Sequence, residues 1–122
     1  PYPSQVIRIV VPSAPSTPPD IISRVIANEL QAANGWRVIV ENKPGAVQTI
    51  AGADVVKQPA DGYSIFAMSV PIAAAPAFLA RMPFDVAKDL MPVAKVSTSY
   101  NVLVVHPDVA AKSVSELVAL LK

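Results

Sequence analysis

Apolar and polar positions along the first 80 residues follow a recurring order. Residues 5–11 are mostly β-branched and almost continuously apolar, which is typical of a strand buried on both faces of a parallel sheet. Residues 12–19 follow, with four prolines and three hydroxyl residues, and predict an irregular loop. Apolar residues then recur at helical spacing from Asp20, a natural N-cap, to Asn34 and Gly35, a typical stop.

The same order of strand, loop and helix returns twice. The pattern predicts strands at residues 36–41 and 63–68, and helices at residues 49–57 and 72–79. Successive units of this kind imply parallel pairing of their strands. The sequence therefore predicts an α/β fold built on a mostly parallel sheet with flanking helices.

The pattern changes after residue 80. Residues 86–90 predict about one helical turn, and residues 91–97 and 100–106 predict strands. Ser113 to Glu116 resembles a capping box that opens a helix running to Lys122. Because that helix would reach the last residue without a C-cap, we expect the chain to be a fragment.

Composition and charge narrow the function classes. The chain has 122 residues, 52% of them hydrophobic, and its 16% of charged residues is below a globular average of roughly 25%. The net charge is +1 and the basic residues are scattered singly, which argues against nucleic-acid binding. The apolar runs are too short to cross a bilayer. The absence of cysteine excludes disulfides, thiolate metal sites and cysteine nucleophiles.

The loops after the three predicted strands form the candidate site. Loops at the carboxyl ends of parallel strands bind ligands in open α/β sheets, and each one here leads into a helix N-terminus that favours an anion. Small hydroxyl residues in these loops could add hydrogen-bond donors to a carboxylate: Ser13, Ser16, Thr17, Thr49 and Ser69. The alternative is that they serve only as turn and cap residues, with Asp20 as a cap paired to Arg24.

An enzyme, a small α/β hydrolase or transferase, is a second possibility. Ser13 or Ser69 would act as a nucleophile with His106, the single histidine, as its base. That arrangement requires His106 to lie within about 2.6–3.2 Å of one serine. The sequence contains no glycine-rich nucleotide fingerprint or phosphate-binding loop, and no metal-ligand spacing.

Five segments together carry a family resemblance. In order and spacing they resemble the Bug (TctC-like) family, the extracytoplasmic solute receptors of tripartite tricarboxylate transporters. The segments are PYPSQVIRIVVPSAP, DIISRVIANEL, VIVENKPGA, ADGYSI and NVLVVHP. The resemblance covers essentially the whole chain.

The resemblance implies a lobe of the periplasmic-binding-protein type (type II) that closes over a small carboxylate solute and presents it to a membrane permease, without a cofactor or a reaction. It also implies a periplasmic location, with any signal peptide already removed. Three groups of residues would contact the solute: Ser13, Ala14, Ser16 and Thr17; Ala46, Val47, Gln48 and Thr49; and Ser69, Val70, Pro71 and Ile72.

Two departures from the family pattern bear on the site. Glycine pairs are replaced by Ser16-Thr17 and by Val47-Gln48, which should reshape or narrow the pocket, with Gln48 reaching a second group of the solute. Family members are also much longer. We expect residues 1–100 to form the opening of the first lobe and residues 101–122 a truncated start of the second.

The missing second wall has two consequences. We expect the isolated chain to bind solute weakly or not at all. Its strand edges and incomplete lobe also leave open a structural role, in which the chain associates with copies of itself.

Overall fold

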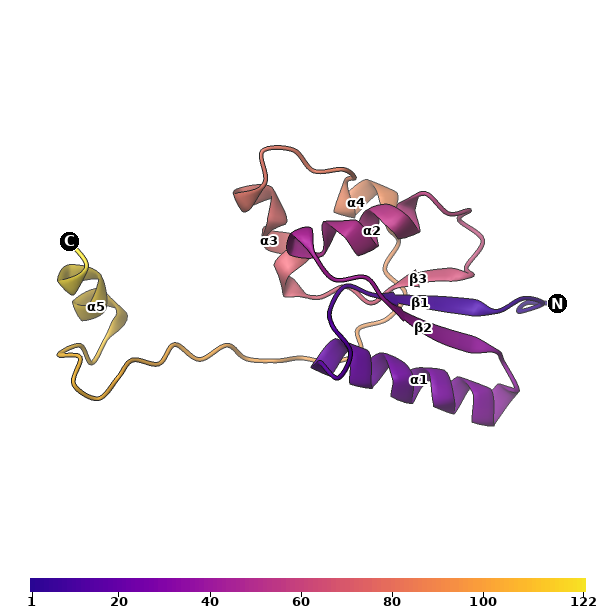
Figure 1. Ribbon diagram of the computed structural model, residues 1–122, viewed down its shortest axis with the longest axis horizontal. Helices are drawn as coiled ribbons and strands as arrows, with labels where there is room; N and C mark the ends of the chain where they lie inside the picture. The colour runs from indigo at the N-terminus through magenta and orange to yellow at the C-terminus, as the bar shows by residue number, and fades with distance from the viewer.

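A three-stranded parallel sheet organises the computed structural model, which describes residues 1–122 (Figure 1). The strands are β1 (Ile7–Val11), β2 (Val38–Asn42) and β3 (Ser64–Phe66). Their order is β2-β1-β3, and both pairings are parallel, with Val10 opposite Glu41 on one side and Phe66 on the other. The predicted α/β fold with a parallel sheet is confirmed.

Helices cover both faces of this sheet (Figure 1). Helix α1 (Pro18–Asn34) lies against one face, and α2 (Thr49–Val56), α3 (Val70–Phe78) and the short α4 (Val86–Asp89) lie on the other. A 3-10 turn, η1 (Ala46–Gln48), precedes α2. None of these helices has the length and hydrophobicity of a membrane-spanning segment.

The core lies around β1, the central strand. Val10 is fully buried and packs with Ala51 and Val55 of α2. Farther along the same face, the buried Phe84 ring packs against Ile72 and Ala75 of α3. This continuous burial explains why β1 is almost entirely apolar, as expected of a central parallel strand.

Helix α1 begins earlier than predicted. Its N-cap is Thr17, and Pro18 and Pro19 occupy the first turn, where a missing N–H removes no helical hydrogen bond. The prediction that Asp20 is the N-cap is therefore wrong. The predicted end is confirmed, because Gly35 follows the helix in the left-handed conformation (φ 69°) and donates its N–H to Gln31.

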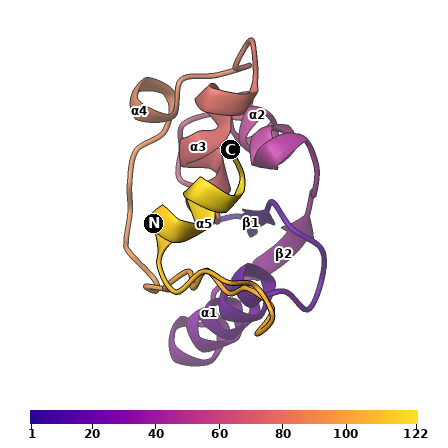
Figure 2. The same ribbon diagram turned by 90° about the vertical axis from the view of Figure 1, so that its left-hand side faces the viewer.

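The predicted strands at residues 91–97 and 100–106 are wrong. Both segments run extended but pair with no strand, and their side chains are exposed. The chain leaves the sheet here and ends in α5 (Val114–Leu120), away from the other helices (Figure 1). Seen from that end of the molecule, α5 lies in front of the sheet (Figure 2). Ser113 caps α5 by accepting the Glu116 N–H, as predicted. The apolar pattern after residue 90 has nothing to pack against in this chain.

Candidate functional site

The three groups of predicted site residues lie at one edge of the sheet. Residues 12–17 connect β1 to α1, residues 43–48 connect β2 to α2, and residues 67–69 connect β3 to α3. We call these the first, second and third loops. Because the three strands are parallel and adjacent, all three loops emerge at their carboxyl ends.

Asn42, the last residue of β2, ties the second strand to the first loop. Its side-chain amide donates to the Ser13 carbonyl at 3.0 Å and to the Asp20 carboxylate at 2.8 Å. Its oxygen accepts a 3.0 Å hydrogen bond from Arg24. Asn42 was not among the predicted site residues, although a polar side chain at the end of an apolar strand was a visible signal.

Asp20 holds the first loop from within α1. Its buried carboxylate accepts the Ser16 N–H at 2.9 Å and pairs with Arg24 at 2.9 Å, so the predicted pairing is confirmed. Hydrogen bonds from Arg24, Asn42 and the Ser16 N–H, in that order of effect, lower the pKa of Asp20 to about 2. The carboxylate is ionised at neutral pH and engages the Arg24 charge.

Three of the five predicted hydroxyl groups donate their protons inside the protein. Thr17 donates to the Ala14 carbonyl at 2.7 Å. A hydroxyl carries one hydrogen, so in the 2.7 Å contact between Ser13 and Thr17 the proton comes from Ser13. Thr49 donates to the Ala46 carbonyl at 2.7 Å. These hydroxyls shape the loops and offer a solute only their lone pairs.

The second loop has an unusual backbone. Ala46, Val47 and Gln48 all adopt positive φ angles, of 45°, 51° and 72°. This region is strained for any residue with a Cβ atom, and most of all for a β-branched residue such as Val47. Ser16 of the first loop is similar (φ 66°). Of the four positions where the family resemblance placed glycine, Ser16, Val47 and Gln48 thus keep a left-handed backbone while carrying side chains, and Thr17 is extended.

Gln48 links the second loop to the third. Its side chain is almost fully buried, and its amide nitrogen lies 2.5 Å from the Ser69 hydroxyl oxygen. The Ser69 N–H points to the Gln48 oxygen at 3.4 Å. The structure thus brings two predicted site residues together, and the carboxamide of Gln48 faces Ser69.

A set of main-chain N–H groups in the loops and at the start of α3 has no acceptor within the protein. We call it the free N–H set; it comprises the N–H groups of Ser13, Ala14, Thr17, Gly45, Ala46, Val47 and Val70. Ser13 and Thr17 are half-buried, and the other members are exposed. N–H groups that have no acceptor within the protein can donate to a ligand, so this set is suited to an anionic acceptor.

Pro71 and Ile72 differ from the other predicted site residues. Pro71 is exposed and has no N–H to donate. The Ile72 side chain is wholly buried against Ala75 and Phe84, and its N–H donates to the Ser69 carbonyl at 3.2 Å. Ile72 therefore anchors the start of α3 in the core.

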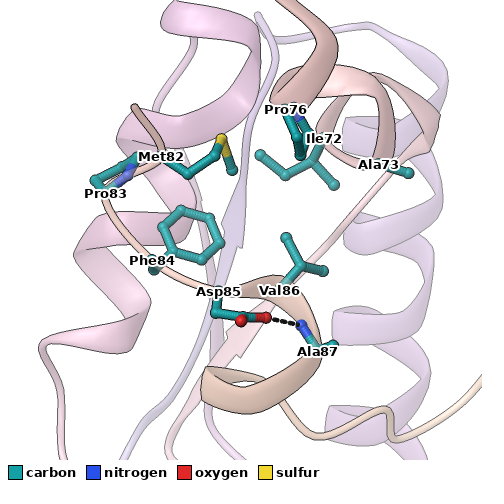
Figure 3. Close-up of a pocket in the computed structure, with 9 residues that line it drawn as sticks. All are labelled: Ile72, Ala73, Pro76, Met82, Pro83, Phe84, Asp85, Val86 and Ala87. Atoms are coloured by element: carbon teal, nitrogen blue, oxygen red, sulfur yellow. Dashed lines mark hydrogen bonds between the residues drawn. The ribbon is translucent and has the colours of Figure 1, made fainter. Parts of the chain in front are cut away.

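An apolar pocket of about 610 Å³ lies between α3 and residues 82–87. Met82, Phe84 and Val86 face α3 across it (Figure 3). The single charged residue of its lining, Asp85, accepts hydrogen bonds from the first N–H groups of α4. The pocket lacks convergent polar donors, so it does not suit a carboxylate.

The geometry that the hydrolase alternative requires is not met. His106 lies in the extended segment, is largely exposed, and faces Asp108 at 3.4 Å. It forms no hydrogen bond with Ser13 or Ser69. No group of three metal-ligating side chains is present either.

Known proteins resemble this chain over most of its length. The family described as "Tripartite tricarboxylate transporter family receptor" (TctC) matches residues 22–122. Protein BugT of Bordetella pertussis is 34% identical over 97% of this chain, and a UPF0065 protein of Bordetella bronchiseptica is 35% identical over 97%. The chain spans 37% and 36% of their lengths.

Two solved structures share the fold. The structure of R. palustris Rpa4515 with adipate superimposes with a TM-score of 0.75 at 30% identity, over 98% of this chain and 40% of that one. The structure of a periplasmic transporter gives a TM-score of 0.59 at 33% identity, over 70% of this chain and 29% of that one. The sequence and fold agree, and the chain belongs to the tripartite tricarboxylate transporter receptor (TctC, or Bug) family.

Proposed function

We propose that this chain forms the anion-binding wall of a periplasmic receptor. The receptor captures a small solute bearing a carboxylate and presents it, unchanged, to the membrane permease of a tripartite tricarboxylate transporter. The observation that carries the proposal is the free N–H set, which lies in the first two loops and at the start of α3. Side-chain hydrogen bonds of Asn42 and Gln48 link these segments to one another.

The charges around the loops support recognition by main-chain donors. The Arg24 guanidinium pairs with Asp20, and the Lys43 ammonium lies 2.9 Å from Asp54. The positive potential offered to a solute therefore comes from unpaired N–H groups and from the N-terminus of α1, α2 and α3. Each hydrogen bond to a charged acceptor contributes about 1.5–3 kcal/mol.

Relatives support the class of solute. R. palustris Rpa4515, whose structure contains adipate, aligns with nearly the whole of this chain. Adipate is a linear dicarboxylate, and a carboxylate matches the donors described above. We therefore infer a solute with at least one carboxylate end.

The second wall of the site would come from a second lobe. We propose that residues 1–100 open the first lobe and that residues 101–122 begin the second, consistent with the share of BugT that the chain spans. The apolar side chains of residues 102–104 support this, because each is more than two-thirds exposed and lacks a packing partner here. A single wall should bind with millimolar affinity.

An NMR titration of the ¹⁵N-labelled chain tests the proposal. Succinate, glutarate and adipate, each added to about 100 mM, should shift the amide signals of the three loops, since a millimolar Kd corresponds to about 4 kcal/mol. Glutaramide, the neutral diamide of glutarate, is the matched control and should shift them much less. The absence of shifts in the loops with every carboxylate would contradict the proposed function.

A further inference from the structure

The orientation of the Gln48 carboxamide follows from the groups that it faces. A main-chain N–H is always a donor, so the side of the carboxamide near the Ser69 N–H must be the oxygen. The amide nitrogen then faces the Ser69 hydroxyl oxygen, which can only accept from it. One carboxamide therefore engages both polar groups of Ser69, and flipping it would set two donors against each other.

This arrangement leaves the Ser69 proton uncommitted. The hydroxyl accepts from Gln48 and donates to no group within the protein. The protons of Ser13, Thr17 and Thr49 are donated to neighbouring acceptors, as described above. Ser69 is half-buried at the third loop, so its proton is both positioned and accessible.

We propose that Gln48 is a positioning residue that turns the Ser69 hydroxyl proton toward the solute. The inference rests on the proposed function and specifies it: the part of the solute beside Ser69 must be a hydrogen-bond acceptor. A carboxylate oxygen fits this position, whereas an amide N–H or an ammonium group would meet a donor. Gln48 acts here through Ser69 rather than by contact with the solute.

A double-mutant cycle tests the coupling, with Kd for glutarate measured by the same NMR titration. Ser69→Ala removes the donor and should weaken binding by about tenfold, the effect of one charge-assisted hydrogen bond. Gln48→Met keeps the length of the side chain without its polar atoms, and should weaken binding several-fold. The double variant should bind as Ser69→Ala does, within about twofold. Ser99→Ala, in the exposed extended segment, is the control and should match the wild type.

Gln48→Glu adds a readout that a structural role would not change. Its carboxylate can accept both the N–H and the O–H of Ser69, so the link between the loops persists while the proton turns away from the solute. The ratio of the glutarate affinity to the glutaramide affinity should fall more than tenfold. Part of this fall comes from repulsion between the new carboxylate and the solute, which does not depend on Ser69. The other part acts through the Ser69 proton, so the fall should be smaller when Ser69→Ala is already present.

The outcomes separate the inference from the function on which it rests. If glutarate binds and the two single effects add in the double variant, Gln48 contacts the solute directly and the inference is wrong. The inference is also wrong if glutarate binds and neither variant changes its Kd. If no carboxylate binds to the wild type, the proposed function fails and the inference fails with it.

Discussion

The side-chain amide of Asn42 lies 2.8 Å from the Asp20 carboxylate and joins the end of β2 to the start of α1. The same amide supports the first loop through the Ser13 carbonyl. Asn42→Ala would leave both acceptors with fewer donors and should lower the free energy of unfolding by about 1–3 kcal/mol. Urea denaturation measures the change. Asn101→Ala, at an exposed position, should have almost no effect, and equal effects of the two variants would contradict this role.

Stability should depend on the ionisation of Asp20 below pH 4. Its pKa is lowered to about 2 in the folded protein from an ordinary value of 3.8. A lowered pKa means that the stabilisation is complete above pH 4 and is lost as the pH falls toward 2. The Asp20→Asn variant has no carboxyl group at this position to protonate. The difference in free energy of unfolding between the wild type and this variant should therefore shrink as the pH falls from 4 toward 2.

Urea midpoints between pH 5 and pH 2 measure this difference. The carboxylates of Asp54 and Asp85, whose pKa values are also lowered, give both proteins a common decline that cancels in the comparison. Asp108→Asn, at a carboxylate that is 90% exposed, should follow the wild-type curve. A constant gap between wild type and Asp20→Asn over the whole range would contradict the assignment.

The elements predicted correctly from the sequence are those whose signals are local. The continuous apolar run of β1 and the helical spacing up to Gly35 both depend on neighbouring residues, and both elements form as expected. The same order of strands and helices also predicted that the three loops lie together at the carboxyl ends of the strands. Family resemblance then identified which loop positions to examine.

Long-range contacts were not predictable in this way. Asn42 meets Asp20 across 22 residues, and Gln48 meets Ser69 across 21, so no local spacing indicates either bond. The strand expected at residues 100–106 failed for a related reason. Its β-branched pattern is real, but a strand forms only when another edge supplies hydrogen bonds.

Gly52 of α2 should resist substitution because of Phe84. A Cβ atom added at Gly52 would lie 2.2 Å from the tip of the Phe84 ring, far inside van der Waals contact. Gly52→Ala should gain about 1 kcal/mol in helix propensity yet lose more than that through overpacking of the core. We expect a net loss of about 1 kcal/mol or more in urea denaturation.

A second substitution separates the clash from other effects at Gly52. Phe84→Leu removes the ring edge, so Gly52→Ala should cost less in that background than in the wild type. Equal costs in the two backgrounds would show that the ring is not the cause. Gly35→Ala makes no such contact and should be insensitive to Phe84→Leu.

Val47 is the position where replacing a side chain should increase stability. Its φ of 51° costs a residue with a Cβ atom about 1–2 kcal/mol, whereas glycine adopts this conformation freely and loses about 0.5–1 kcal/mol in chain entropy. Val47→Gly should therefore raise the free energy of unfolding by about 0.5–1 kcal/mol. Val47→Ala keeps the Cβ atom but loses the β-branch, so it should gain less than Val47→Gly. The Val47 side chain is exposed and both variants retain its N–H, so carboxylate titrations should still shift the amide NMR signals of the second loop. Equal stability of the glycine and alanine variants would mean that the left-handed backbone is not what limits stability here.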